Sequence, residues 1–248
     1  MDEFPQRSKV SIIIPAYNEE RTIREVVLKA TTYGEVIVVD DGSIDRTAEL
    51  AKLAGARVIS HPRNMGQSAA DRTGYLNSNR EVVALIDADI QQVPEELPRV
   101  IRPILANQAD MVIGSKYLGR REYQSNFPNM LMDRILGAIL RARFGVTVTN
   151  PFSGMRAMRR TCIDFGYLKG DKHECAVELA FSFAWHGYRI MEVPRTARRR
   201  IAGRSSIRFT DGRRIIVRLL AVMLSPPKLA SPRKQPSALI RVPQGLGS

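Results

Sequence analysis

Short apolar runs alternate with segments of helical spacing along the first half of the chain. The apolar runs predict strands at residues 10–15, 35–39, 57–60, 81–86 and 111–114. Between them, apolar positions three and four apart predict helices at residues 19–31, 43–54, 66–78 and 94–106. Ser43 or Asp45 is the expected N-cap of the second helix. Strands that alternate with helices indicate a single α/β domain with a mainly parallel sheet.

The second half of the chain has fewer periodic segments. An apolar helix is expected at 130–144, and an amphipathic helix at 211–224, where apolar residues share one side and arginines lie on another. Five prolines and little apolar periodicity predict a disordered tail after residue 224. We therefore divide the chain into an N-terminal extension (1–9), one domain (10–210), the amphipathic helix (211–224) and the tail (225–248).

No apolar segment reaches the roughly 20 residues that a membrane-spanning helix needs. Residues 1–9 also lack the apolar core of a signal peptide. We expect a cytoplasmic protein that touches the inner face of the membrane peripherally through the helix at 211–224. Packing of that helix on the domain explains the same pattern equally well.

Charge is distributed unevenly over the 248 residues, which carry a net charge of +13. Residues 1–120 hold 15 Lys and Arg against 17 Asp and Glu, whereas residues 121–248 hold 23 against 8. A basic second half favours anionic partners, although it also fits a solvated basic face. The two cysteines, Cys162 and Cys175, are too few for a disulfide framework and lack the spacing of a zinc site.

Acidic residues directly follow two of the predicted strands. Asp40 and Asp41 follow the second strand, and Asp87 and Asp89 follow the fourth. The carboxyl ends of parallel strands meet at one edge of a sheet, where ligands bind in this class of fold. Oxygen donors from Asp87, Asp89 and Gln91 suit Mg²⁺ or Mn²⁺. The pattern therefore predicts a divalent-metal site at that edge.

Seven stretches of the chain resemble a known family. They are VSIIIPAYNEE (10–20), VIVVDDGSIDRT (36–47), NMGQSAA (64–70), ALIDADIQQVPEEL (84–97), MVIGSKY (111–117), NPFSGMRAMRR (150–160) and EVPRTARRRIAGRSS (192–206). Together they resemble family 2 glycosyltransferases of the GT-A fold, which is a Rossmann-like sheet flanked by helices. Within that family they are most similar to dolichol-phosphate mannose synthases and other polyprenyl-phosphate glycosyltransferases. Two positions depart from the family pattern: Ser68 replaces a usual Gly, and Ser206 a usual Lys.

The resemblance implies a site for a nucleotide sugar, with GDP-mannose the first candidate and UDP-glucose the second. Asp87, Asp89 and Gln91 would bind the metal and the diphosphate, and Asp40 would support the turn. The residues implied to contact the nucleotide sugar are Pro15, Tyr17, Glu19, Val39, Asp41, Asp87, Ala88, Asp89, Gln91, Lys116 and Arg200.

The resemblance also implies a polyprenyl phosphate as acceptor, bound by Arg134, Ser153 and Arg156. Such a phosphate is already an anion, so a single displacement with inversion at the sugar needs no general base. Asp89 and Arg200 are the implied catalytic residues, with Arg200 closing on phosphate from a late loop. Glu178 has two open interpretations, as a base or acceptor-orienting acid and as a structural helix contact.

Two alternative functions fit parts of the sequence. A family 2 transferase with a soluble sugar or small-molecule acceptor would need a base, and Glu178 is the obvious candidate. A nucleic-acid-binding protein would explain the arginines, of which ten lie between Arg189 and Arg218. It would not explain acids at strand ends, so we expect no nucleic acid as partner.

Overall fold

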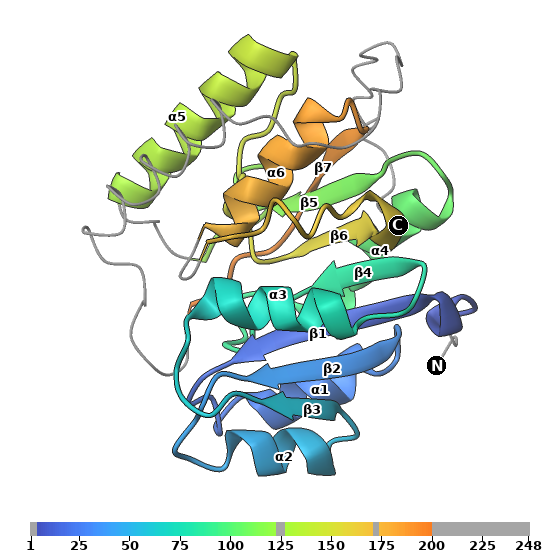
Figure 1. Ribbon diagram of the computed structural model, residues 1–248, viewed down its shortest axis with the longest axis vertical. Helices are drawn as coiled ribbons and strands as arrows, with labels where there is room; N and C mark the ends of the chain where they lie inside the picture. The colour runs from blue at the N-terminus through green and yellow to red at the C-terminus, as the bar shows by residue number, and fades with distance from the viewer. Residues whose placement is uncertain (1–3, 123–126, 171–173, 200–248) are drawn as a thin grey trace.

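The computed structural model describes residues 4–122, 127–170 and 174–199. Its centre is a seven-stranded sheet in the order β3-β2-β1-β4-β6-β5-β7 (Figure 1). The strands are β1 (Val10–Ala16), β2 (Glu35–Asp40), β3 (Arg57–Ser60), β4 (Val82–Leu85), β5 (Met111–Ser115), β6 (Arg156–Arg159) and β7 (Ile190–Pro194). The predicted 211–224 helix, the tail and Arg200 lie outside the described residues.

The sheet is parallel except at one strand. β6 runs antiparallel to both of its neighbours, β4 and β5, while β1–β4, β1–β2, β2–β3 and β5–β7 pair in parallel. Because β6 reverses direction between them, β4 and β5 still point the same way. The carboxyl ends of β1, β2, β4, β5 and β7 therefore share one edge of the sheet.

Within the described residues, six α-helices cover the two faces of the sheet. They are α1 (Ile23–Ala30), α2 (Thr47–Leu53), α3 (Gln67–Asn77), α4 (Leu97–Leu105), α5 (Phe127–Phe144) and α6 (Cys175–Trp185), with 3₁₀ turns at Arg7–Lys9, Pro94–Glu96 and Arg160–Cys162. Along β1, Ile12 and Ile14 pack with α1 and α4, and Ile13 packs with α3, α5 and α6. Successive residues of a strand therefore pack in two separate apolar layers. The helices of these layers lie in front of and behind the sheet in Figure 1.

The α/β class, the mainly parallel sheet and the five predicted strands are confirmed. Three elements carried no clear signal, namely β6, α6 and β7. β6 is only four residues long, and ten of the eleven α6 residues are buried, so that helix has no polar stripe. Among the described segments, none of the helices combines the length and apolar character needed to span a bilayer.

Several predicted boundaries and one predicted cap were wrong. The expected 19–31 helix begins only at Ile23, and residues 94–96 form a 3₁₀ turn ahead of α4. Arg46, not Ser43 or Asp45, is the N-cap residue of α2. The Ser43 hydroxyl accepts the Asn18 N–H at 2.9 Å. Asp45 accepts the Glu20 N–H at 3.2 Å on one oxygen and, on the other, the N–H of Thr47, the first residue of α2, at 3.0 Å. These two side chains fasten the loop after β1 to the loop after β2.

Candidate active site

The loops after β1 and β2 form one end of the candidate site. Tyr17 is 45% exposed, so its ring is available for stacking, whereas Pro15 and Val39 are buried side by side in paired strands. The Glu19 N–H donates to the Thr47 hydroxyl at 2.8 Å, which places Glu19 at the start of α2. Of the predicted nucleotide contacts in this region, Tyr17 presents the most accessible side chain.

Asp41 joins the end of β2 to the start of α3. Its carboxylate accepts the N–H groups of Met65 and Gly66 at 2.9 and 2.8 Å and lies 2.7 Å from the Nδ1 of His61. Asp40 supports the turn as expected, because its carboxylate accepts the Ser43 N–H at 3.1 Å. Asp41 is 3% exposed, so its contacts here are with the chain itself. Its contact with the nucleotide sugar stays a prediction.

The metal-site candidates lie just beyond β4. Asp89 is buried, and its carboxylate accepts the Gln91 N–H at 3.1 Å. Asp87 receives two side-chain amides, from Gln67 at 3.1 Å on one oxygen and from Gln92 on the other. The carboxylates of this Asp-x-Asp turn are hard oxygen donors of the type that Mg²⁺ and Mn²⁺ take, and two of them leave coordination positions for phosphate oxygens. The donor set fits the predicted cation.

Gln67 and Gln92 were not among the predicted site residues. Gln92 contacts Asp87 a second time, since its side-chain oxygen accepts the Asp87 N–H at 3.3 Å. The backbone oxygen of Gln91, a predicted site residue, accepts the Arg198 N–H at 2.9 Å. That bond brings the segment after β7 against the Asp87–Asp89 turn. The stretch NMGQSAA (64–70), which carries part of the resemblance to the family, is the signal that could have identified Gln67.

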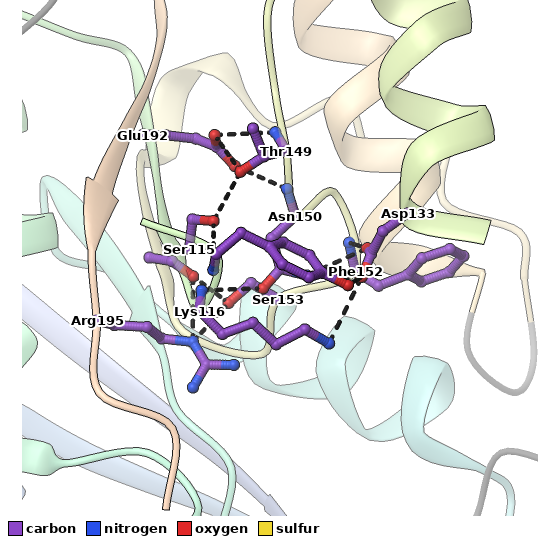
Figure 2. Close-up of polar contacts among 11 residues, drawn as sticks. Ser115, Lys116, Asp133, Thr149, Asn150, Phe152, Ser153, Glu192 and Arg195 are labelled. Atoms are coloured by element: carbon purple, nitrogen blue, oxygen red, sulfur yellow. Dashed lines mark hydrogen bonds and ion pairs between the residues drawn. The ribbon is translucent and has the colours of Figure 1, made fainter. Parts of the chain in front are cut away.

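A second group of polar residues, here called the Asp133 cluster, lies beyond β5 and consists of Lys116, Tyr117, Asp133 and Asn150. Asp133 is 2% exposed and accepts the Tyr117 hydroxyl at 2.8 Å and the Asn150 amide at 3.1 Å. The Lys116 ammonium lies 3.5 Å from the same carboxylate (Figure 2). Burial raises the pKa of Asp133 and lowers that of Lys116, because it disfavours the charged form of each. The predicted nucleotide contact Lys116 thus lies among residues of α5 and the 149–153 loop.

Glu192 and Arg195, on β7 and just after it, hold the 149–153 loop in place. Glu192 accepts the N–H groups of Thr149 and Asn150 at 2.9 and 2.8 Å. The Arg195 Nε donates to the Gly114 carbonyl at 3.1 Å and to the Ser153 hydroxyl at 3.2 Å (Figure 2). Neither residue was predicted. They show that Ser153, a predicted acceptor contact, is buried and bonded within the protein.

The remaining predicted residues lie in different surroundings. Arg156 is buried in β6 and donates to the Ser153 carbonyl, whereas Arg134 is exposed on α5. Glu178 is buried in α6 and accepts the N–H groups of Lys169 and Gly170 at 3.0 and 3.1 Å. Ala88 is buried between the two metal-site acids. Ser153 and Arg156 therefore lie in contact, whereas Arg134 lies on the exposed side of α5, close enough for its charge to act on Tyr117.

Gly154 connects the two sides of the site. A Cβ atom at this position would collide with the Asp87 carboxylate and with the side-chain amide of Gln92. The acceptor-side loop therefore packs its backbone directly against the predicted metal ligand. This contact places the loop that carries the predicted acceptor residue Ser153 beside the predicted metal ligand Asp87.

Comparisons with known proteins agree with this arrangement. Residues 11–165 match the model of the glycosyl transferase family 2. An uncharacterized protein of Methanocaldococcus jannaschii is 35% identical over 76% of this chain and 81% of its own length. The dolichol-phosphate mannosyltransferase of Pyrococcus furiosus is 31% identical over 81% of this chain, which spans 59% of that relative. An undecaprenyl-phosphate 4-deoxy-4-formamido-L-arabinose transferase of Salmonella typhimurium is 31% identical over 63% of this chain and 50% of its own.

Solved structures give the same fold. Glucosyl-3-phosphoglycerate synthase of Mycobacterium tuberculosis, in complex with Mn²⁺ and UDP-glucose, has a TM-score of 0.69 and 27% identity over 89% of this chain and 80% of its own. The fold is thus the GT-A fold expected from the sequence. With its acids at the carboxyl edge of a GT-A sheet, the chain belongs to glycosyltransferase family 2.

Proposed function

We propose that this glycosyltransferase moves a hexose from a nucleotide sugar to a polyprenyl phosphate, with inversion at the sugar and with the help of Mg²⁺ or Mn²⁺. The observation that carries the proposal is the contact between Gly154 and Asp87. It puts the acceptor-side loop within van der Waals reach of the residue that would hold the metal and the diphosphate. The two reactants can then meet without a large movement of the chain.

Asp87 and Asp89 would hold the divalent cation, with Gln67 and Gln92 fixing the orientation of Asp87. When bound, the cation neutralises the charge that develops on the leaving diphosphate. The two glutamines leave Asp87 little freedom to rotate, which favours a preformed site. Tyr17 would stack on the base, because its ring is exposed at the same edge of the sheet.

The acceptor side is basic. Lys116 and Arg195 lie close enough that the charge of Arg195 also lowers the pKa of Lys116, after the larger effect of burial. A polyprenyl phosphate brings its own negative charge to the anomeric carbon and needs no proton removed. The work left to the protein is to position that phosphate and to screen it from the diphosphate.

GDP-mannose is the first candidate donor, because the Pyrococcus relative is a dolichol-phosphate mannosyltransferase. UDP-glucose is the second, because the Mycobacterium structures contain UDP-glucose and Mn²⁺. A cytoplasmic enzyme at the inner face of the membrane would meet the nucleotide sugar and the polyprenyl phosphate there.

A soluble acceptor is the second candidate function. Glucosyl-3-phosphoglycerate synthase has been solved with phosphoglyceric acid, a small phosphate-bearing molecule. A hydroxyl acceptor would require a base, and Glu178 is the candidate we assign to it.

Sugar transfer to lipid tests the proposal. The protein is incubated with Mn²⁺, a polyprenyl phosphate in detergent, and labelled GDP-mannose or UDP-glucose in separate tubes. We expect label to enter the lipid phase from GDP-mannose, EDTA to stop the transfer, and Asp89→Ala to reduce it at least about 100-fold. The matched control is Asp164→Ala, since the Asp164 carboxylate accepts the Gly166 N–H at 3.0 Å within its own turn, away from the predicted site residues.

Slow hydrolysis of either donor with no label in the lipid phase would contradict the proposal and favour a soluble acceptor. Glu178→Gln separates the two candidates further. With a soluble hydroxyl acceptor it should abolish transfer, whereas with a phosphate acceptor the remaining amide can still accept the Lys169 and Gly170 N–H groups and much of the activity should persist.

A further inference from the structure

The outer face of α5 is apolar and exposed. Leu131 and Ile135, four residues apart, are 46% and 43% exposed, and Ala138 continues the same stripe one turn later. Large exposed apolar residues usually occur singly on a protein surface. Here they align along one helix, with spacing that keeps them on one side.

Arginines flank this stripe, and acids are missing from it. Arg134 and Arg141 are exposed at positions that border Leu131, Ile135 and Ala138. The only acidic residue in the α5 sequence is Asp133, which is 2% exposed on the opposite face. The outer face thus combines apolar side chains with positive charge alone, a composition typical of helices that lie in a membrane interface.

The inner face of α5 reaches the site. Asp133 binds Tyr117 and Lys116, while Leu136 and Leu140 pack in the apolar layer in front of the sheet. The loop that carries Tyr117 adds exposed groups at this end, because Leu118 is 51% exposed and the Arg121 guanidinium lies 5.7 Å from the Tyr117 ring centre. One helix therefore separates the Asp133 cluster from an apolar, basic surface.

We propose that the outer face of α5 is a docking surface for a lipid bilayer that contains anionic headgroups. Leu131 and Ile135 would enter the interface, and Arg134 and Arg141 would contact lipid phosphates while their stems cover the apolar stripe. The inference rests on the proposed function in one respect: a polyprenyl phosphate keeps its chain in the bilayer and exposes its phosphate at headgroup level. A bilayer on this face would present that phosphate at the edge of the Asp133 cluster.

Vesicle flotation with the full chain tests the surface. Vesicles of two parts phosphatidylcholine to one part phosphatidylglycerol are compared with vesicles of phosphatidylcholine alone. We expect the protein to prefer the anionic vesicles, and Leu131→Glu with Ile135→Glu to weaken that binding about tenfold or more, because two carboxylates would face the headgroups.

The matched control is Leu53→Glu with Leu76→Glu, which places the same charges at exposed leucines of α2 and α3. The control should bind vesicles as the unchanged protein does, and both doubles should keep the circular dichroism and melting temperature of the native chain. Equal loss of vesicle binding in the two double variants would mean that added negative charge weakens binding wherever it is placed. That result would overturn the assignment to α5.

A second readout separates this inference from the proposed function. Transfer to a short polyprenyl phosphate in detergent should survive Leu131→Glu with Ile135→Glu, because neither side chain belongs to the site. Retained transfer with unchanged vesicle binding would overturn the docking surface alone. If sedimentation instead shows a dimer that this variant turns into a monomer, a second copy of the chain covers the face and the lipid assignment is wrong.

Discussion

Gly154 is the residue at which absence of a side chain matters most. Its Cα faces the Asp87 carboxylate and the Gln92 amide, so the loop that follows α5 packs against the end of β4. Ser68 is a second informative small residue, because its hydroxyl accepts the Cys175 N–H at 3.0 Å and joins the starts of α3 and α6. The missing Cβ of Gly154 and the hydroxyl of Ser68 thus each determine how two segments far apart in the sequence pack together.

Gly154→Ala should therefore damage catalysis without unfolding the protein. The added methyl group would displace Asp87 or the loop, and a shift of about 1 Å at such a site can cost on the order of 100-fold in rate. Steady-state kcat/KM for sugar transfer measures the effect, and circular dichroism checks the fold. The control is Gly166→Ala, where the nearest atom to a new Cβ would be the Asp164 carboxylate at 3.3 Å. Unchanged kcat/KM in Gly154→Ala would show that the contact is unimportant.

At the scale of elements, Asp133 joins α5 to two loops. Its carboxylate binds Tyr117 and Lys116 after β5 and Asn150 ahead of β6. Burial raises the pKa of Asp133, while the nearby ammonium and hydrogen bonds oppose that rise. A buried pair of this kind is costly to break from one side, because the partner is left charged and poorly solvated.

A double-mutant cycle on Asp133 and Lys116 measures this connection. Asp133→Asn should lower the free energy of unfolding by about 3 kcal/mol, and adding Lys116→Met should cost less than the sum of the single changes by about 1 kcal/mol or more. Urea unfolding gives both values. The exposed pair Lys29–Glu25, at 2.8 Å, is the reference and should couple by less than about 0.5 kcal/mol. Additive effects at Asp133 and Lys116 would mean that α5 is held by apolar packing alone.

At the scale of the whole molecule, a buried acid makes stability depend on pH. Asp71 on α3 lies near Arg156, and burial raises its pKa to about 7, against the lowering effect of that arginine. In the part of the chain that the structure describes, an oxygen of Asp71, the Tyr75 hydroxyl and the Arg156 Nε lack hydrogen-bond partners. The folded protein therefore binds a proton at Asp71 that the unfolded chain releases near pH 4.

Between about pH 4 and pH 7 the folded state holds more protons at Asp71 than the unfolded state, so this residue makes stability fall as pH rises. Asp71→Asn removes that penalty and should stabilise the protein at pH 8 by up to about 4 kcal/mol, while changing little at pH 4. Melting temperatures across this range in metal-free buffer provide the measurement. Asp110→Asn is a control whose effect on stability should have the opposite sign, because the pKa of Asp110 is lowered. Burial alone would raise that pKa, but the hydrogen bonds and charge of Arg189 outweigh burial. If Asp71→Asn shifted stability equally at all pH values, the assignment to Asp71 would be wrong.

The sequence alone determined the first five strands, the α/β class, the GT-A fold and the glycosyltransferase family. The strands and the α/β class follow from local pattern, because a buried parallel strand must be apolar along its length and the helices between strands must be amphipathic. The GT-A fold and the family followed from the resemblance of seven stretches of the chain to family 2 glycosyltransferases. The acids after β2 and β4 could be assigned to the site for the same reason, since strand direction alone brings them to one edge.

Only the tertiary structure decided which polar groups meet. The insertion of β6 between β4 and β5 places the Ser153–Gly154 turn against Asp87, and no local pattern encodes that strand order. The same holds for Gln67, Glu192 and Arg195, whose partners lie on other elements. Periodicity reports how each segment is buried, whereas a site depends on side chains that only the packed sheet and helices bring together.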